Sequence, residues 1–573
     1  MSEKFTGIAA SNGIGIAKAY LLVEPDLSIS YNKKISNVNE EVQRVNDALD
    51  ASKSDLEKIK EKAIENLGAE DAAVFDAHIE ILSDPELIAG IQKEINTKHI
   101  NAESAVKDVT DMYIATFEAM TDNAYMQERA ADIRDITKRI NAHLLGIELP
   151  SPALIDEEVV VVAHDLTPSD TAQLDPKFVK GIVTDLGGRT AHAAILARSL
   201  EIPAIVGSKI ATSKIKQDQL VVIDGTNGNV IVTPTKEEVD DYTTQLKKYA
   251  DQKIEQAKLK NADSISKDGV KFVVGANIGS PKDMEAVLNN GAEGIGLYRT
   301  EFLFLDSDHL PTEEEQFQAY KTVLEKMGNK VTTVRTMDIG GDKQLSYWKL
   351  PQEENPFLGY RAIRISLKQT DIFKTQLRAL LRASIYGNLW IMFPMIATLP
   401  EFRAAKKIYD EVYQELQNEN IHVSSQIKVG IMIEVPAAAV LADQFAKEVD
   451  FFSIGTNDLI QYTMAADRGN DSVSYLYQPY NPSILRLIKN VIDSAHKEGK
   501  FAAMCGEMAG DPIAVPILMG MGLDEFSMSA SSILPTRSMM AHLSVNDMKK
   551  LAEDALNSET NEEVIKIVES KIN

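Results

Sequence analysis

Cysteine is almost absent from this sequence. The chain of 573 residues contains one, Cys505, so it can form no intramolecular disulfide and no zinc site built from several cysteines. Long apolar runs are missing too, since none approaches the roughly 20 residues of a membrane-spanning helix. The opening residues, MSEKFTGIAASNGIG, do not have the basic and then apolar layout of a secretory signal. We therefore expect a cytoplasmic protein without membrane insertion.

Positive charge is also in short supply. Lys and Arg total 60 against 85 Asp and Glu, which gives a formal net charge of −25. Proteins that bind duplex nucleic acid need clustered cations, so we expect no nucleic-acid partner, although a local cationic pocket is compatible with this balance. With 44% hydrophobic and 25% charged residues the composition is that of a globular protein. The length predicts about two to four domains.

Two kinds of pattern alternate in the first 234 residues. From Asn37, apolar residues recur at an alternating spacing of four and three, broken only by Ser52, which is typical of a long helix packed on another. Another long helical pattern runs from about Ala102 towards His143. Short β-type runs precede this region and return after it, at 159–163, 181–184, 204–206, 220–223 and 230–232. We therefore predict an α/β domain at 1–24 and 146–234, interrupted by an all-helical domain at 25–145.

The remaining sequence predicts a linker and a barrel. Residues 235–260 contain neither glycine nor proline and begin with a Thr-x-x-Glu capping box, so we predict a linker helix at 235–261. It could be a swivel between two halves or an ordinary surface helix. Strand candidates then alternate with amphipathic segments, which predicts a (β/α)₈ TIM-type barrel at 262–573. The candidates are 270–276, 294–298, 332–337, 389–393, 428–433, 451–454, 501–504 and 525–528.

Polar residues mark the C-terminal ends of these strand candidates, where barrels of this type hold their sites. In chain order they are Asn277, Arg299, Arg335, Glu434, Asn457 with Asp458, and Cys505. Any one of them could be a structural residue in a salt bridge. Several of complementary charge in one barrel indicate an anion-and-metal site, because buried polar groups need partners.

The cations of this set suit an anionic ligand. Arg299 and Arg335 have planar guanidinium groups that match phosphate or carboxylate, and Arg361 and Arg468 are expected at the same face. In the run DIGGDK, the glycines allow a ligand to approach the backbone closely, and Lys343 can contact a phosphate as a point charge. The predicted ligand is a small, doubly anionic molecule.

The carboxylates suit a divalent cation. Glu434 and Asp458 supply two hard oxygen ligands, the number that Mg²⁺ commonly takes from a protein when a phosphorylated ligand supplies more. Asp458 could instead be the N-cap of the helix that follows. We predict a Mg²⁺ that bridges protein and ligand.

A second constellation lies outside the barrel, in the run GGRTAH that ends at His192. Its glycines permit a tight turn, and the N-terminus of the following helix favours anionic groups, so a phosphoryl group on the ring would be stabilised. A lone histidine is more often structural, but the other eight of the nine histidines stand in no comparable turn. We therefore predict that His192 is a nucleophile.

Taken together, these motifs resemble the phosphoenolpyruvate-protein phosphotransferases, Enzyme I of the bacterial sugar phosphotransferase system. The resemblance rests on GGRTAHAAILARSLEIPAIVG, GLYRTEFLF, RTMDIGGDK, NPFLGYRAIR, IMIEVPAAA, FFSIGTNDLIQYTMAADR and MCGEMAGD, in this order across essentially the whole chain. It implies an enzyme that transfers the phosphoryl group of phosphoenolpyruvate to its own His192 and then to the histidine-containing phosphocarrier protein HPr, releasing pyruvate.

The resemblance also implies roles for single residues and domains. Phosphoenolpyruvate would be held by Arg299, Arg335, Asn457 and Arg468. Glu434 and Asp458 would hold Mg²⁺, and Cys505 would give a proton to the enolate carbon, although it could also be a small buried apolar residue. The helical domain would dock the phosphocarrier protein, and the barrel would form a homodimer. Ala191 stands where many relatives have serine, and Ala193 follows the histidine, which puts a hydroxyl contact there in doubt.

Two other functions fit part of the pattern. A pyruvate-phosphate dikinase or phosphoenolpyruvate synthase would need a nucleotide-binding domain, but the residues before the histidine domain read as helices and contain no Gly-x-x-x-x-Gly-Lys loop. A non-catalytic regulator would bind phosphoenolpyruvate without passing phosphate to any partner. The full set of nucleophile, arginines, carboxylates and thiol favours the enzyme. Because His192 and the barrel belong to different domains, we expect the α/β domain to swing between barrel and carrier.

Overall fold

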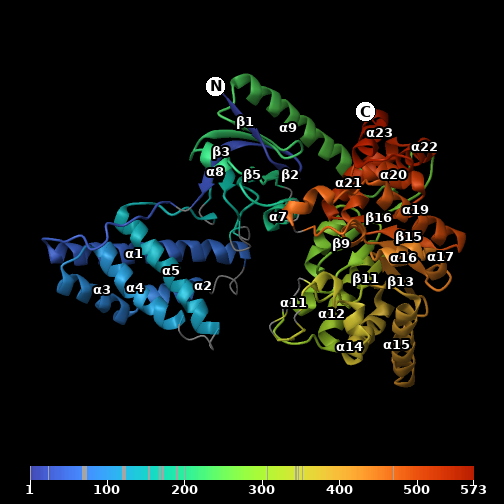
Figure 1. Ribbon diagram of the computed structural model, residues 1–573, viewed down its shortest axis with the longest axis horizontal. Coiled ribbons are helices and arrows are strands. Elements are labelled where there is room, and N and C mark those ends of the chain that lie inside the picture. The colour runs from blue at the N-terminus through green and yellow to red at the C-terminus, as the bar shows by residue number, and fades with distance from the viewer. Residues whose placement is uncertain are drawn as a thin grey trace. The chain divides into compact units, whose positions relative to one another are not determined.

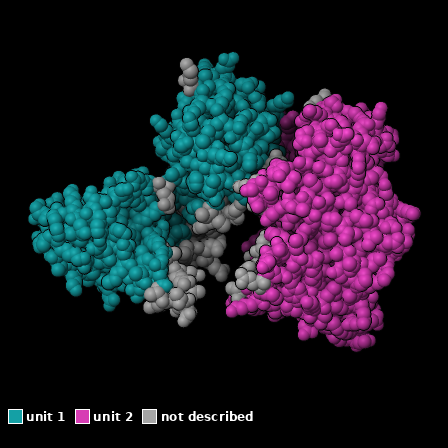
Figure 2. All heavy atoms as spheres, viewed as in Figure 1, with its two compact units in different colours: residues 1–249 teal, residues 250–573 magenta. Residues whose placement is uncertain are grey.

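The structure is a computed structural model that describes residues 2–23, 25–67, 74–118, 124–152, 155–166, 170, 173–188, 191–200, 202–305, 307–341, 345, 347–351, 353–468 and 470–572. The chain divides into two compact units, residues 1–249 and residues 250–573 (Figure 2). No helix in these described ranges is both long enough and apolar enough to cross a membrane.

An eight-stranded sheet forms the α/β part of the first unit (Figure 1). Its strands are β1 (Glu3–Thr6), β2 (Ile8–Ser11), β3 (Ile14–Leu22), β4 (Val159–Ala163), β5 (Val179–Thr184), β6 (Ala204–Val206), β7 (Leu220–Asp224) and β8 (Asn229–Val232), in the order β1-β8-β7-β3-β4-β5-β6-β2. The central β3, β4, β5 and β6 are parallel, and the flanking pairs are antiparallel. The sheet therefore joins strands from both sides of the helical segment.

Helices fill the segment between β3 and β4. They are α1 (Val38–Leu67), α2 (Val74–Leu82), α3 (Pro85–Lys98), α4 (Ala102–Glu118) and α5 (Ala124–Leu145). The spacing along α1 is confirmed as a core face, because Val45, Leu49 and Leu56 are buried. Ser52 is buried among them and its hydroxyl donates to the carbonyl of Ala48 at 2.7 Å, so its position on the apolar face costs no unpaired group. The single helix expected from Ala102 is wrong, since two helices, α4 and α5, occupy that stretch.

The linker helix, α9 (Lys236–Ala257), begins with the expected capping box. The Glu238 amide donates to the Thr235 hydroxyl at 3.2 Å, and the Thr235 amide donates to the Glu238 carboxylate at 2.8 Å. The helix ends at Ala257, before the predicted end at residue 261. Turns at 258–261 continue the chain. None of its residues is buried.

Eight parallel strands close into the predicted barrel in the second unit (Figure 1). They are β9 (Val273–Ile278), β10 (Ile295–Tyr298), β11 (Val331–Arg335), β12 (Asn388–Phe393), β13 (Lys428–Ile433), β14 (Phe451–Ile454), β15 (Phe501–Met504) and β16 (Glu525–Met528). Several predicted boundaries were wrong, most clearly those of two strands: β9 spans 273–278 instead of 270–276 and so contains Asn277, and β11 ends at Arg335 instead of Met337. Side chains fill the interior, chiefly Leu297, Trp390, Met392, Met432, Phe451 and Cys505.

Helices cover the outside of the barrel. The longer ones are α12 (Glu313–Met327), α14 (Thr370–Ala383), α15 (Leu399–Asn418), α19 (Pro482–Lys497), α21 (Ala530–His542), α22 (Val545–Leu556) and α23 (Asn561–Ile572). Shorter ones are α10 (Met284–Asn289), α11 (Phe302–Leu305), α13 (Ile363–Ser366), α16 (Pro436–Val440), α17 (Ala442–Phe445), α18 (Thr456–Met464) and α20 (Ala514–Met521), while α7 (His192–Ser199) and α8 (Ala211–Lys214) belong to the first unit. One continuous apolar core joins the strands to the outer helices.

Candidate active site

Two carboxylates at the barrel mouth each keep a buried oxygen without a protein partner. Glu434 directly follows β13 and is fully buried; its Oε1 accepts the backbone N–H of Met395 at 2.5 Å. Asp458 is 7% exposed, and its Oδ2 accepts from Arg361 at 3.3 Å. Within the described part of the chain, Glu434 Oε2 and Asp458 Oδ1 have no hydrogen-bond partner. Oxygens left this way are costly unless a ligand or cation meets them.

Asp458 is not an N-cap. Helix α18 begins at Thr456, its N-cap position is Gly455, and no side-chain cap bond is made there. Asp458 therefore lies inside the first turn, and its carboxylate is available to the barrel mouth. The alternative that Asp458 is the N-cap is therefore wrong, because the helix begins two residues before it.

The pKa of Glu434 is raised to about 8, chiefly by burial and also by the negative charges of Asp458 and Asp338, while the charges of Arg361 and Arg335 oppose this shift. The carboxyl therefore resists ionisation while no cation faces it. A divalent cation between Glu434 and Asp458 would reverse this effect, because it favours both ionised carboxylates.

Arg335 and Arg361 are fixed by two acidic residues that the sequence analysis did not assign. Arg361 donates through Nε and Nη2 to both oxygens of Asp338, at 2.8 and 2.9 Å. Arg335 pairs with Asp338 at 3.0 Å and with Glu301 at 3.1 Å. Burial acts to lower the pKa of Arg361, but the charge of Asp338 and the hydrogen bonds to it, together with the charges of Asp458 and Glu434, outweigh burial and raise that pKa. The two guanidinium groups are therefore held rigid and ionised.

The glycines of the DIGGDK run bring Asp338 to Arg361. Gly340 has a φ of +102°, and a Cβ there would lie 2.6 Å from the Tyr360 carbonyl oxygen. Only glycine permits both the conformation and the approach. Lys343 in the same run lies outside the described residues.

Arg299 and Arg468 differ from the paired arginines. Both are half-buried, and neither guanidinium has a hydrogen bond or ion pair among the residues that the structure describes. Burial lowers the pKa of Arg299, and the positive charge of Arg335 lowers it further. Cations that lack a protein anion in such surroundings favour an anionic ligand.

The two asparagines have different roles. Asn457 lies in the first turn of α18, and its Oδ1 accepts the Glu507 amide at 3.3 Å. Asn277 lies within β9, where its side-chain amide donates to the carbonyls of Cys505 at 2.9 Å and Ser527 at 3.2 Å. Its Oδ1 accepts the Ser527 hydroxyl at 2.7 Å. Asn277 therefore braces three strands, and the expectation that it follows its strand is wrong.

Cys505 follows β15 at the barrel mouth and is 3% exposed. Burial raises the pKa of its thiol to about 11, although Ser453, Arg335 and Arg299 act in the opposite direction. The thiol is therefore protonated at neutral pH, and it is close enough to the arginines for their charges to act on it. A protonated thiol can donate a proton, whereas a nucleophilic cysteine needs a lowered pKa.

The histidine motif lies in the connection between the parallel strands β5 and β6 of the first unit's sheet. Helix α7 begins at His192, after an extended Ala191 that makes no side-chain cap bond. Gly187 has a φ of +98°, and the Ala191 amide donates to the Gly188 carbonyl at 3.0 Å, which closes the turn. The side chain of His192, like the whole of residues 189 and 190, lies outside what the structure describes.

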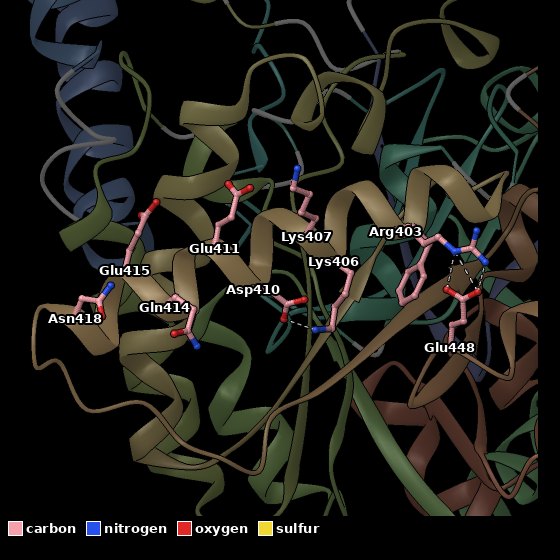
Figure 3. Close-up of a pocket in the computed structure, with 10 residues that line it drawn as sticks. Arg403, Lys406, Lys407, Asp410, Glu411, Gln414, Glu415, Asn418 and Glu448 are labelled. Atoms are coloured by element: carbon pink, nitrogen blue, oxygen red, sulfur yellow. Dashed lines mark hydrogen bonds and ion pairs between the residues drawn. The ribbon is translucent and has the colours of Figure 1, made fainter.

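A separate groove runs beside α15 (Figure 3). Arg403 pairs there with Glu448 at 2.5 Å, and Lys406 pairs with Asp410. Its lining residues do not follow barrel strands, so the groove is distinct from the barrel mouth.

Three family models match this chain. They are described as PEP-utilising enzyme, N-terminal, at residues 6–129; PEP-utilising enzyme, mobile domain, at 155–228; and PEP-utilising enzyme, PEP-binding domain, at 253–545. Similar curated proteins are the phosphoenolpyruvate-protein phosphotransferases of Enterococcus faecalis, 63% identical over 99% of both chains, and of Latilactobacillus sakei, 62% identical over 99% of both. That of Staphylococcus aureus is 59% identical over 100% of both.

Proposed function

Since this chain belongs to the phosphoenolpyruvate-protein phosphotransferase family and is a phosphotransferase of that kind, we propose how its residues divide the reaction. The barrel binds phosphoenolpyruvate, His192 takes its phosphoryl group, and the phosphocarrier protein HPr receives that group from His192. The observation that carries the proposal is the pair of buried oxygens on Glu434 and Asp458 that have no hydrogen-bond partner among the described residues.

The charges of the mouth match the ligand. Phosphoenolpyruvate carries a phosphate and a carboxylate, and Arg299 and Arg468 offer guanidinium groups without a protein anion among the described residues. Arg335, Arg361 and Asn457 complete the binding set from fixed positions, and Lys343 is proposed to join them. Preorganised charges of this kind lower the cost of reaching the transition state, since phosphoryl transfer depends mainly on positioning and electrostatics.

Mg²⁺ fits the two carboxylates. Glu434 and Asp458 would hold it through the oxygens that lack partners in the described structure. When bound, it would neutralise charge on the phosphate that is transferred.

Phosphoryl transfer from phosphoenolpyruvate to His192 needs no further reactant. A ring nitrogen of His192 bonds to phosphorus as the bond from phosphorus to the enol oxygen breaks. The electron pair stays on the enolate, which takes a proton at carbon from the Cys505 thiol and becomes pyruvate. The raised pKa keeps that proton on sulfur until the enolate forms. The thiolate then regains a proton from water.

The family resemblance supports a proposal for docking and assembly. We propose that the helices within residues 25–145 bind HPr, that the barrel at 262–573 forms the homodimer, and that residues 1–24 and 146–234 carry His192 between barrel and carrier. His192 and the binding residues lie in different compact units, so the units have to meet for transfer.

Labelled phosphoenolpyruvate with Mg²⁺ tests the proposal. The wild type should become labelled, the His192→Ala variant should not, and the His164→Ala variant, which changes a histidine at the end of β4, should label normally. The Cys505→Ala variant should bind ligand but form pyruvate slowly. Label at another residue would contradict the role of His192, and labelling by ATP would favour a dikinase.

A further inference from the structure

A buried arginine in the barrel unit donates to main-chain carbonyls instead of a carboxylate. Arg537 of α21 is 1% exposed. Its Nη1 donates to the carbonyls of Leu259 at 2.9 Å and Lys260 at 3.2 Å, and its Nη2 donates to Gly291 at 2.8 Å. Nε donates to the Ser264 hydroxyl at 3.0 Å. Its contact with a carboxylate, that of Glu293, is 3.9 Å long.

Two of those carbonyls belong to the segment that directly follows the linker helix. Helix α9 ends at Ala257, and Leu259 and Lys260 lie in the turns that follow. The Leu259 carbonyl also accepts the Ala262 amide at 2.9 Å, so the guanidinium is a second donor to it. The positive charge lies close to the end of the helix in sequence, where it opposes the helix dipole. Arg537 thus fastens the segment after the linker helix to the barrel.

Two neighbours complete a socket for this segment. Gly291 has a φ of +66°, and a Cβ there would lie 1.9 Å from the Lys260 carbonyl oxygen. Glu293 accepts the Ser264 amide at 2.9 Å and the Val274 amide at 2.7 Å. Arg537, Gly291 and Glu293, which we call the linker socket, therefore hold residues 259–264 against the barrel.

The other end of the linker is attached to the first unit, where Glu238 in the first turn of α9 pairs with Lys4 of β1 at 2.7 Å. None of the residues of α9 is buried. A buried guanidinium without a close carboxylate is expensive, and burial lowers the pKa of Arg537. The fold retains it where it can engage several backbone oxygens at once, which a lysine could not do.

We infer that Arg537 is a positioning residue for phosphoryl transfer, because it fixes the end of the linker to the barrel and leaves motion of residues 1–249 to the chain before Leu259. This inference rests on the proposed function. Without the socket, the linker would pivot freely at its base, and the histidine would meet the barrel mouth less often in a productive orientation.

Distance measurements test the anchor without reference to activity. Spin labels at Ala257→Cys in the exposed end of α9 and Lys549→Cys on α22, in a Cys505→Ser background, report the spread of linker positions over the barrel. The wild type should give one narrow distribution. Arg537→Met should broaden it about twofold, Arg537→Lys should give an intermediate width, and Arg403→Met, which removes an exposed arginine of α15, should change nothing.

A second variant keeps the test decisive if Arg537→Met does not fold. Gly291→Ala leaves the arginine intact but pushes the Lys260 carbonyl out of the socket, so it should broaden the distribution as well. Unchanged widths in the folded Gly291→Ala and Arg537→Lys variants would overturn the inference.

The rates of the two half-reactions, phosphorylation of His192 and transfer from His192 to the carrier, distinguish a positioning role of Arg537 from a general loss of structure. With Cys505 restored, Arg537→Lys should bind phosphoenolpyruvate within twofold of the wild type and pass phosphate from His192 to the carrier at the normal rate. Phosphorylation of His192 should slow about tenfold. Equal slowing of both half-reactions, or none, would refute the positioning role. If the wild type itself took no label, the proposed function would fail while the distance result stood.

Discussion

At the scale of single residues, the barrel mouth combines two kinds of arginine. Arg335 and Arg361 are locked by Asp338 and Glu301, while the guanidinium of Arg299 has no such partner within the described ranges. The positions of Arg299 and Arg335 were predictable from the strand ends, because charges at such positions converge in a barrel. Which carboxylates neutralise them was not, since pairing depends on side-chain reach across strands. The only sequence signal for this pairing was the presence of the acidic residues Asp338 in RTMDIGGDK and Glu301 in GLYRTEFLF.

Asp338→Asn should damage the pocket severely. It leaves the buried Arg361 fork without its carboxylate, and breaking a buried pair costs about 3–5 kcal/mol. We expect affinity for phosphoenolpyruvate to fall at least about tenfold, with a lower melting temperature. Calorimetric titration and thermal unfolding measure both. Asp410→Asn on the exposed α15 is the control, with an effect of about 1 kcal/mol or less; equal effects from the two would contradict the assignment.

Cys505 should react slowly with alkylating agents. Only the thiolate reacts, and burial holds the pKa near about 11, so the thiolate fraction should rise about tenfold per pH unit until that pH. Rates of iodoacetamide modification between pH 7 and 10, followed by mass spectrometry, provide the check. A plateau near pH 8 or 9 would mean an ordinary exposed thiol and would argue against the proton donor.

At the scale of elements, runs of β-branched and apolar residues predicted which segments form strands. The residues at which those strands begin and end could not be predicted in the same way, because they depend on tertiary contacts. Asn277 belongs to β9 because its amide satisfies carbonyls of two neighbouring segments, which a sequence pattern does not reveal. The same holds for Ser52, whose polar character would argue against a core position unless its bond to the preceding turn were known. For α9, the capping box was readable because both partners lie three residues apart.

The strand β16 places a carboxyl group inside the barrel. Glu525 is 3% exposed, and its Oε1 has no partner among the described residues. Gly275 and Gly296 make room for it, since a Cβ on either would lie within 3 Å of that oxygen. Burial, then the charges of Asp524 and Glu293, raise the pKa of Glu525 from 4.5 to about 7.

Glu525 should therefore make stability depend on pH. Below pH 4.5 the carboxyl group of Glu525 is neutral in both the folded and the unfolded protein. Between pH 4.5 and about 7 it ionises only in the unfolded protein, so the free energy of unfolding falls by about 3 kcal/mol as the pH rises. Above that range the loss is constant. Glu525→Gln should remove this loss, as measured by urea unfolding at pH 5 and 8, whereas exposed Glu569→Gln should not. Parallel pH profiles for wild type and Glu525→Gln would exclude the effect.

At the scale of the whole molecule, the residues proposed to bind phosphoenolpyruvate lie within 250–573, and His192 lies within 1–249. This division was predictable from the change in periodicity along the chain, because a helical repeat, short mixed strands and regular strand–helix units are distinct patterns. The family resemblance then added the order of events. The linker socket was not predictable, since Arg537 is far in sequence from the residues that it holds.

Binding and phosphorylation should accordingly separate. His192→Ala should bind phosphoenolpyruvate with wild-type affinity, because no residue of the mouth is altered, while it accepts no phosphate. Calorimetry in the presence of Mg²⁺ measures the first and labelling the second. A large loss of affinity in this variant would mean that the histidine contributes to ground-state binding.

The exposed surface of α9 makes it a site for limited proteolysis. Because none of its side chains is buried, a protease can reach the lysines near its middle, at 247 and 248, without opening a core. Brief digestion with trypsin should nick the protein there first and yield two fragments that each stay folded. The barrel fragment would retain the socket and the stub of helix fastened in it.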